Sequence, residues 1–370
     1  MRILHVFKTY LPDTHGGIEQ VIRQMCLSTS KLGIENRVFT LTKNNAPDFV
    51  EIDKIVVRRI PSILDIASTP LSISAFPEFN KEATKADIIH FHFPWPLMDL
   101  MQAISWHGKP YLVSYHSDII KQKKLLLFYQ PIMRQFLGNA HAITVATSSY
   151  MKSSPVLSKL KSKTHILPYG LEESSYPAIN VSMIENWKNR IGKRFFLFVG
   201  VLRYYKGLHI LLDALQGLDY PVAIVGDGPE KDRLSGQAAR LGLKNCHFLG
   251  RLDDQSVAGL YEACECFVFP SHLRSEAFGM ALLEAAMYGK PLISFEIGSG
   301  MSEINLDGIS GLSVKPNSTS LREAMMKMWS NPELREEFGI SARSHFEKNF
   351  TSENMGKNLS AIYENILKPH

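Results

Sequence analysis

The sequence predicts an α/β protein built from two doubly wound, Rossmann-like domains. First, its 370 residues exceed the roughly 100–200 residues of a single domain. Second, short apolar runs typical of buried strands alternate with helical patterns in both halves, which favours parallel sheets covered on both faces. Third, several of these runs end in glycine-containing or charged loops, and ligands bind at the carboxyl ends of strands in such sheets.

In the first half, apolar runs separated by helical patterns predict the strands. The chain opens with a strand over residues 2–7. A helix follows over about 18–32, and Gly33 stands in the expected place for its C-cap. A second helical pattern covers residues 97–106. The other predicted strands cover residues 37–41, 55–59, 87–91 and 111–115.

The second half repeats this alternation of strand and helix. Residues 195–199 form a continuous apolar run that predicts a buried strand. The remaining strands are predicted at residues 221–225, 247–249, 266–269 and 291–295, and the helices at 207–215, 230–241, 254–264 and 280–288.

A polar stretch between residues 171 and 194, with Pro177 and Asn180, predicts the domain boundary. We therefore expect an N-terminal domain at residues 1–175 and a C-terminal domain at residues 190–350. Residues 351–370 are predicted to hold one more helix, over 352–367, that returns to the N-terminal domain.

The composition is that of an ordinary soluble protein. Hydrophobic residues make up 45% and charged residues 21%, which excludes general disorder. The longest apolar runs have about eight residues, whereas a membrane-spanning helix needs roughly 20. The apolar run at the start of the chain is interrupted by Lys8 and is too short for a secretory signal. We therefore expect a cytoplasmic protein. The cysteines form no C-x-x-C pair and are predicted to be buried thiols: Cys26, Cys246, Cys264 and Cys266.

The positive charge is concentrated in the first half. Residues 1–180 carry 20 Lys and Arg against 14 Asp and Glu, and residues 181–370 carry 21 against 22. This imbalance suggests an anionic partner, or only a solvated face. Lys121, Lys123 and Lys124 precede an apolar helical pattern, which suits docking on an anionic membrane as well as an ordinary core-facing helix. Basic clusters interleaved with aromatic residues are not evident, so no nucleic-acid partner is expected.

Three loops carry candidate binding residues. Gly16 and Gly17 open the first helix, where free backbone amides suit an anion, although a plain tight turn is the alternative. His116 follows a strand and could donate a hydrogen bond to a polar ligand. Arg203 and Lys206 lie between a strand and a helix, where they could stabilise a pyrophosphate leaving group or simply be solvated.

A fourth candidate runs from Glu276 to Glu284. Gly279 again exposes backbone amides at a helix start, and a carboxylate can accept from two vicinal ribose hydroxyls. The rest of the helix is apolar, so the presence of Glu284 within it calls for a functional reason.

In this order, these motifs resemble the retaining nucleotide-sugar glycosyltransferases of the GT-B fold, specifically the large fourth family. The motifs are Gly-Gly-x-Glu at 16–19, the strand-end His116, the Arg/Lys loop, Gly-Asp-Gly-Pro at 226–229 and Glu-x7-Glu at 276–284. The run over residues 10–22 is also similar to bacterial O-antigen mannosyltransferases that use GDP-sugars.

The resemblance assigns roles in donor binding. Glu284 should bind the donor ribose and Glu276 the hydroxyls of the transferring sugar. Arg203 and Lys206 should neutralise the diphosphate as the glycosidic bond breaks. The family often places an Arg directly after the glycine of this loop, where this chain has Val201.

The remaining assignments concern the backbone amides, the base and the other domain. The amides that should bind the pyrophosphate are those of Gly279, Met280 and Ala281. His116 should contact the donor sugar near its anomeric centre. Gly16 and Gly17 should approach the donor, Glu19 should face the acceptor, and Arg251 should contact the base.

No two aspartates are two residues apart, so the chain has no D-x-D pair, and we expect neither a metal nor another cofactor. Arg203, Lys206 and helix N-termini would then offset the leaving-group charge. The resemblance implies retention of the anomeric configuration, and no pair of carboxylates resembles a hydrolase dyad. Retention without a clear enzymic nucleophile suggests attack from the same face as departure.

The function implied is retaining transfer of a hexose to a lipid-linked saccharide acceptor in lipopolysaccharide O-antigen biosynthesis. GDP-mannose is the favoured donor, held by the C-terminal domain, with the acceptor held by the N-terminal domain. The enzyme would be cytoplasmic, or peripheral on the inner membrane face. The alternatives are a nucleotide-sugar epimerase of the same architecture and a non-catalytic anion- or lipid-binding module.

Overall fold

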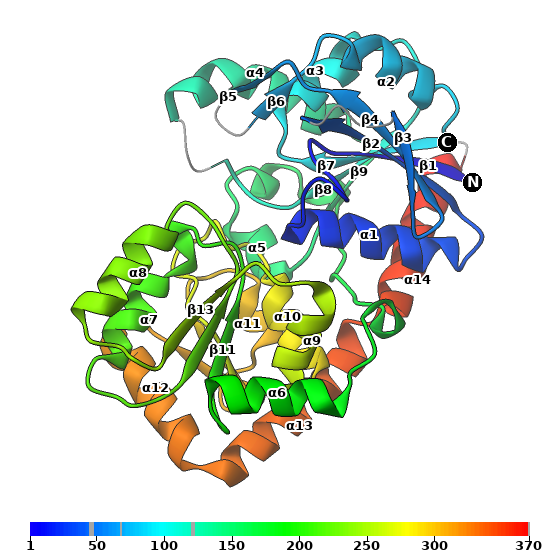
Figure 1. The fold of residues 1–370 in the computed structure, drawn as a ribbon. Coiled ribbons are helices and arrows are strands. Elements are labelled where there is room, and N and C mark those ends of the chain that lie inside the picture. The colour runs from blue at the N-terminus through cyan, green and yellow to red at the C-terminus, as the bar shows by residue number, and fades with distance from the viewer. Residues whose placement is uncertain (44–47, 67–68, 120–122, 369–370) are drawn as a thin grey trace. The chain divides into compact units, whose positions relative to one another are not determined.

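The computed structural model describes residues 1–43, 48–66, 69–119 and 123–368 (Figure 1). The chain forms two compact units. The first consists of Met1–Gly170 with Thr351–His370, and the second of Leu171–Phe350. Each unit holds its own sheet between layers of helices, so the predicted class of two Rossmann-like α/β domains in a GT-B fold is confirmed.

The sheet of the first unit has the order β10-β9-β8-β7-β1-β2-β4-β3. Its strands are β1 (Arg2–Val6), β2 (Glu35–Thr42), β3 (Phe49–Ile52), β4 (Ile55–Pro61), β7 (Ile88–Phe93), β8 (Tyr111–Tyr115), β9 (Ala142–Val145) and β10 (Thr164–Ile166). Its pairings are parallel except that of β3 with β4, which is antiparallel. This corrects the expectation of an all-parallel sheet. Asp53 and Lys54 have φ of 51° and 65°, the left-handed pair that closes a tight hairpin.

Helices cover both faces of this sheet, and the C-terminal helix is one of them. They are α1 (Gly17–Ser30), α2 (Ala75–Ala83), α3 (Pro96–Ile104), α4 (Lys123–Asn139), α5 (Ser148–Ser153) and α14 (Ser352–Leu367). In Figure 1, α14 lies beside α1. A Cβ on Gly356 would lie 2.9 Å from the Cβ of Ser28, so the glycine permits this close approach. A separate hairpin, β5 (Leu64–Ile66) with β6 (Thr69–Leu71), completes the unit.

The sheet of the second unit is parallel, with the order β13-β12-β11-β14-β15-β16. Its strands are β11 (Phe196–Val199), β12 (Val222–Val225), β13 (Cys246–Gly250), β14 (Cys266–Phe269), β15 (Leu292–Phe295) and β16 (Gly311–Val314). The strand order reverses between β11 and β14. Open α/β sheets bind ligands at such a switch point, outside the carboxyl ends of the strands.

In Figure 1, α7, α8 and α12 lie on one side of this sheet, and α6, α9 and α10 on the other. The helices are α6 (Val181–Ile191), α7 (Leu208–Leu215), α8 (Lys231–Arg240), α9 (Asp254–Ala263), α10 (Met280–Met287), α11 (Met301–Ile304), α12 (Ser318–Ser330) and α13 (Pro332–Asn349). The polar stretch predicted as a boundary contains α6. The Asn180 side chain caps it, and Met183 and Trp187 pack against Gly259 of α9.

The cysteines are free thiols. Cys26, Cys264 and Cys266 are buried, as predicted, and Cys246 is half-buried. Among the described residues, no helix is both long and apolar enough to cross a membrane.

Candidate active site

Two loops flank the switch point of the second unit and carry four of the predicted site residues: Arg203, Lys206, Glu276 and Gly279. The loop over residues 200–207 follows β11 and includes the 3₁₀ turn Tyr204–Lys206. The loop over residues 270–279 follows β14 and includes Glu276. Because β11 and β14 are neighbours, their loops emerge side by side at the carboxyl edge of the sheet.

Lys206 and Glu276 form an ion pair between these two loops. The distance from Lys206 Nζ to Glu276 Oε2 is 2.5 Å, and the two side chains are 11% and 12% exposed. Ser271 Oγ donates to the same carboxylate oxygen at 3.0 Å, and Lys206 Nζ lies 4.5 Å from the centre of the Phe269 ring. Burial is the largest single influence and lowers the pKa of Lys206, but the charge of Glu276, the neighbouring Tyr205 and the hydrogen bond to Glu276 together outweigh it and hold the pKa above its ordinary value. The lysine is therefore a permanent cation.

Glycines allow the backbone to form this site. Gly207 has a φ of +70°, and a Cβ there would lie 1.8 Å from the carbonyl oxygen of Pro270. Gly279 has a φ of +99°, and its Cβ would press on the Phe269 ring at 3.3 Å. Residues with a Cβ rarely adopt these left-handed backbone conformations, so glycine is required at both positions.

Glu284 lies in α10 and is held by two tyrosine hydroxyls. Tyr176 donates to Oε1 at 3.0 Å, and Tyr261 donates to Oε2 at 2.9 Å. Burial raises the pKa of Glu284 to about 6, and the two hydrogen bonds oppose that rise. The carboxylate is thus ionised at neutral pH and already oriented.

The other predicted donor contacts of this unit are backbone amides at the start of α10 and two arginine side chains. Gly279 precedes the first turn of α10, where its carbonyl accepts from the amides of Leu282 and Leu283. The amides of Met280 and Ala281 precede these and have no intrahelical acceptor. Arg203 and Arg251 are both exposed at carboxyl ends of strands, after β11 and β13 respectively.

In the first unit, Gly16 and Gly17 begin α1 as predicted, but Glu19 folds back on them. Its Oε1 accepts hydrogen bonds from Thr9 at 2.8 Å and Thr14 at 2.7 Å, and the side chain is buried. A Cβ on Gly16 would lie 2.5 Å from Glu19 Oε2. This geometry favours a structural role for Glu19, and its contact with the acceptor stays a prediction.

His116 ends a chain of hydrogen bonds through the core of the first unit. Its Nε2 lies 3.0 Å from His92 Nδ1, His92 Nε2 lies 3.0 Å from His5 Nδ1, and His5 Nε2 lies 3.1 Å from Asn36 Oδ1. The Tyr169 hydroxyl lies 2.7 Å from His116 Nδ1. His5, His92 and His116 therefore occupy one face of adjacent strand ends, with their rings stacked.

Asn36 fixes the direction of this chain. Its amide nitrogen donates to backbone and hydroxyl oxygens near α1, so its oxygen faces His5 and accepts from Nε2. Each imidazole then donates from Nε2 and accepts at Nδ1, and Tyr169 donates to His116. Burial lowers the pKa of His5 to about 4 and that of His116 to about 3, so the chain is neutral. Both ring nitrogens of His116 are engaged, and its predicted contact with a donor sugar would have to displace one partner.

His5, His90 and His92 are also close enough together to be considered as metal ligands. His90, however, bonds to Tyr363 at 2.6 Å and to Ser114 at 2.7 Å, and the other two rings are occupied as described above. Every ring nitrogen of the three has a protein partner, so the cluster does not fit a metal ion. The expectation that no cofactor is needed stays a prediction.

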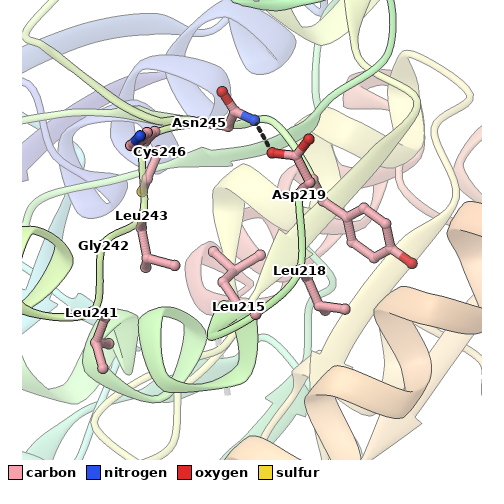
Figure 2. A pocket seen from close by; sticks show the side chains of 11 residues that line it. Leu215, Leu218, Asp219, Leu241, Gly242, Leu243, Asn245 and Cys246 are labelled. Carbon is pink, nitrogen blue, oxygen red and sulfur yellow. Dashed lines mark hydrogen bonds between the residues drawn. The ribbon is translucent and has the colours of Figure 1, made fainter.

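A hollow in the second unit lies at the opposite end of the sheet from Lys206, Glu276 and Glu284. Its volume is about 290 Å³, and the residues that line it lie at the ends of α7 and α8 and at the amino ends of β12 and β13. Figure 2 shows the lining side chains, among them Leu215, Leu241 and Cys246. Asn245 donates to Asp219 at its rim, and burial raises the pKa of Cys246 to about 12. Because the predicted donor-binding residues of this unit lie at the opposite, carboxyl ends of the strands, this hollow is separate from the candidate site.

The sequence-based prediction thus grouped Lys206, Glu276 and Glu284 but missed the side chains that hold them. Tyr176 and Tyr261 lie 108 and 23 residues from Glu284, and no local pattern marks them. The buried histidines had a readable signal, because His90 and His92 alternate with Phe91 and Phe93 along β7.

Comparison with known proteins places both halves of the chain among glycosyltransferases. Residues 15–174 match the family model described as Glycosyltransferase Family 4, and residues 183–345 match Glycosyl transferases group 1. The chain is 50% identical to the D-rhamnosyltransferase WbpZ of Pseudomonas aeruginosa, over 95% of this chain and 93% of that protein. It is 42% identical to the O-antigen chain mannosyltransferase C of Escherichia coli, over 100% and 99%.

Solved structures share the fold at much lower identity. Sucrose-phosphate synthase from Thermosynechococcus elongatus has a TM-score of 0.79 and 19% identity, covering 99% of this chain and 98% of that one. Anabaena HepE in complex with UDP and glucose has a TM-score of 0.78 and 18% identity, covering 99% and 100%.

Proposed function

This chain belongs to glycosyltransferase family 4, and we propose that it transfers a hexose from a nucleoside-diphosphate sugar to a lipid-linked saccharide during O-antigen assembly. The observation that carries the proposal is the grouping of a buried cation, Lys206, with two carboxylates, Glu276 and Glu284, at the switch point of the second unit. These are the groups that a diphosphate, a sugar and a ribose require.

The chemistry follows from where charge develops. As the bond from the anomeric carbon to the phosphate oxygen breaks, negative charge grows on the diphosphate. Lys206 and the backbone amides of Met280 and Ala281 at the N-terminus of α10 would offset it. The acceptor hydroxyl oxygen bonds to the anomeric carbon, and its proton passes to the departing phosphate oxygen. Glu276 would bind hydroxyls of the transferring sugar, and attack on the face of departure would retain the anomeric configuration.

Two donor sugars are supported by different relatives. GDP-mannose is favoured by the motif over residues 10–22 and by likeness to the mannosyltransferase of Escherichia coli. D-rhamnose, which is 6-deoxymannose, is favoured by the higher identity to the Pseudomonas D-rhamnosyltransferase. A transfer assay with GDP-mannose and GDP-D-rhamnose in competition distinguishes them, and NMR of the product anomer tests retention.

A thermal-shift panel of GDP, UDP, ADP and dTDP tests the choice of nucleotide. A ligand that binds only the folded state stabilises it by mass action and so raises the melting temperature. At a ligand concentration of 100 times the Kd, the free energy of unfolding rises by about 2.7 kcal/mol. We expect the largest shift with GDP; a preference for UDP would contradict GDP-mannose as donor. Formation of an isomerised sugar nucleotide from donor alone would instead indicate the epimerase, and no shift with any nucleotide would indicate the non-catalytic module.

We also propose that the first unit docks on an anionic membrane, where a lipid-linked acceptor would lie. This unit carries 22 Lys and Arg against 14 Asp and Glu, whereas the second carries 19 against 22. Leu100 and Ile104 of α3, with Trp106 just beyond it, are 40%, 56% and 93% exposed. Cations and an exposed apolar group including Trp suit the interface of a bilayer. The sequence-based prediction of docking rests on Lys121, Lys123, Lys124 and the apolar helical pattern that follows them. The side chains of residues 120–128 lie outside the described residues, and Met133, Phe136 and Leu137 further along the helix are buried in the core.

Flotation with phosphatidylglycerol-containing vesicles tests this docking. Trp106→Ser should reduce the bound fraction severalfold. Ile340→Ser is the matched control, because Ile340 is 65% exposed on α13 of the other unit and should not matter. Equal binding of wild-type protein to neutral and anionic vesicles, or equal loss in both variants, would contradict the proposal.

A further inference from the structure

We infer that Tyr176 and Tyr261 are positioning residues that present the Glu284 carboxylate to the two vicinal hydroxyls of the donor ribose. The inference rests on the proposed function, in which Glu284 binds that ribose. It adds two residues, neither of them in the motif, that determine how tightly the ribose is held.

The geometry gives each carboxylate oxygen its own tyrosine. Tyr176 follows the short turn Glu173–Ser175 and donates to Oε1 at 3.0 Å, whereas Tyr261 comes from α9 and donates to Oε2 at 2.9 Å. The carbonyl oxygen of Ala281 lies 3.2 Å from the same Tyr261 hydroxyl, but the carboxylate is closer and charged and is therefore the stronger acceptor of its one proton. The last torsion of a free Glu side chain is broad and poorly defined. Hydrogen bonds at both oxygens select a single orientation of the carboxylate.

Counting lone pairs shows what remains for a ligand. An ionised carboxylate has about four acceptor positions, two on each oxygen. The tyrosines occupy one on each, so one position per oxygen is left. Two acceptor positions on adjacent oxygens match two hydroxyls on adjacent carbons, which is the arrangement of the 2′ and 3′ hydroxyls of ribose.

The tyrosines are themselves held in place. Tyr261 is buried, and its ring stacks on that of Tyr288 with centres 5.2 Å apart and planes 9° apart. The Tyr176 ring meets the Tyr288 ring edge-on, with centres 6.4 Å apart. Burial and the charge of Glu284 raise the pKa of the Tyr261 hydroxyl well above its ordinary value. It therefore acts only as a donor to the carboxylate and takes no part as a base.

Protonation of Glu284 supplies a second readout. Burial brings its pKa to about 6, and the two tyrosine hydrogen bonds hold it below the value that burial alone would produce. The acceptor form is present above that pH and is lost as the pH falls through it. Removing either tyrosine hydroxyl should raise the pKa of Glu284. As the pH is lowered, loss of ribose binding should then begin at a higher pH than in the wild type.

The test is calorimetric binding of GDP, UDP and ADP, each paired with its 2′,3′-dideoxy analogue, to wild-type protein and to Tyr176→Phe and Tyr261→Phe. Tyr288→Phe is the control, because its ring packs in the same cluster and its hydroxyl makes no hydrogen bond within the described residues. Each test variant should bind the best ribonucleotide about tenfold more weakly, the effect of one hydrogen bond to a charged group. It should bind the dideoxy analogue as the wild type does. The acid limb of ribonucleotide binding should also move to higher pH.

The outcomes separate the two levels of the proposal. Equal weakening of ribonucleotide and dideoxy analogue in both variants, or an unmoved acid limb, would overturn the positioning role while leaving the proposed function standing. If no ribonucleotide binds the wild type, or if the wild type does not distinguish the dideoxy analogue, the role of Glu284 fails and the inference falls with it. Retention of wild-type behaviour by Tyr288→Phe is expected.

Discussion

Lowering the pH from 7.5 to 5 should destabilise the first unit by about 4 kcal/mol from His5 and His116 alone. The second unit should lose less, because burial lowers the pKa of its His209, His247 and His272 only in part-buried surroundings. The imidazoles of His5 and His116 are neutral in the folded core, where burial lowers their pKa to about 4 and about 3, whereas an unfolded histidine titrates near 6.5. Stability from such groups is complete above about pH 6.5 and is lost as the pH falls, because only the unfolded state takes up the proton.

The magnitude follows from the width of that window. Between pH 6.5 and 5 the unfolded chain binds close to one proton per histidine that the folded chain does not bind. At about 1.4 kcal/mol per pH unit, each histidine therefore costs about 2 kcal/mol. The pKa values of His90 and His92 are also lowered, by burial and by neighbouring imidazoles, so they add to the loss.

Urea titrations at pH 7.5, 6 and 5, read by hydrogen-exchange mass spectrometry, separate the two units. Peptides from β1 and β7 should lose protection at lower urea as the pH falls, well before peptides from β11 and β14. His5→Gln should reduce the pH slope by about one proton, and the exposed His165→Gln should leave it unchanged. An equal pH response in both units, or a slope of less than one proton for the first, would refute the reasoning.

Three further predictions concern the second unit. Lys206→Met leaves the Glu276 carboxylate buried without its cation, so the free energy of unfolding in urea should fall by about 3–5 kcal/mol. The double variant Lys206→Met with Glu276→Gln should regain that stability, and no recovery would contradict the pairing. Gly207→Ala drives a Cβ into a backbone carbonyl, and its melting temperature should drop several degrees more than that of Gly217→Ala, which has similar φ but open space; equal drops would exclude the clash. Arg203→Ala should keep stability within about 0.5 kcal/mol and raise the donor KM about tenfold, whereas an unchanged KM would remove Arg203 from the site.

The fold could be predicted where the local sequence alone dictates the element. Strands such as β11 and β14 are continuous apolar runs, because both of their faces are buried. The prediction failed where tertiary contacts decide. In α6, Met183, Ile184, Trp187 and Ile191 recur at helical spacing after the N-cap Asn180, but the polar residues between them favour a domain boundary instead. Packing of Met183 and Trp187 on α9 stabilises the segment as a helix.

The candidate site divides in the same way. Glu276 and Glu284 could be chosen from the sequence because a glycine and an apolar helix surround them. Their partners could not, because Tyr176 and Tyr261 reach Glu284 through the fold and not through spacing. His116 lies at the end of a strand, as the sequence predicts. The sequence does not predict that both of its ring nitrogens are engaged, because their partners His92 and Tyr169 are brought to it by the fold.

The central claim is that the second unit's carboxylates and lysine serve transfer of a sugar from a nucleotide. Transfer of radiolabelled mannose or D-rhamnose from its GDP-sugar to a lipid-linked acceptor, by wild-type protein and by Glu276→Gln, tests it most directly. The account predicts that Glu276→Gln binds GDP within about threefold of wild type and transfers at least about 100-fold more slowly. Wild-type transfer rates in Glu276→Gln, with GDP affinity also unchanged, would contradict it.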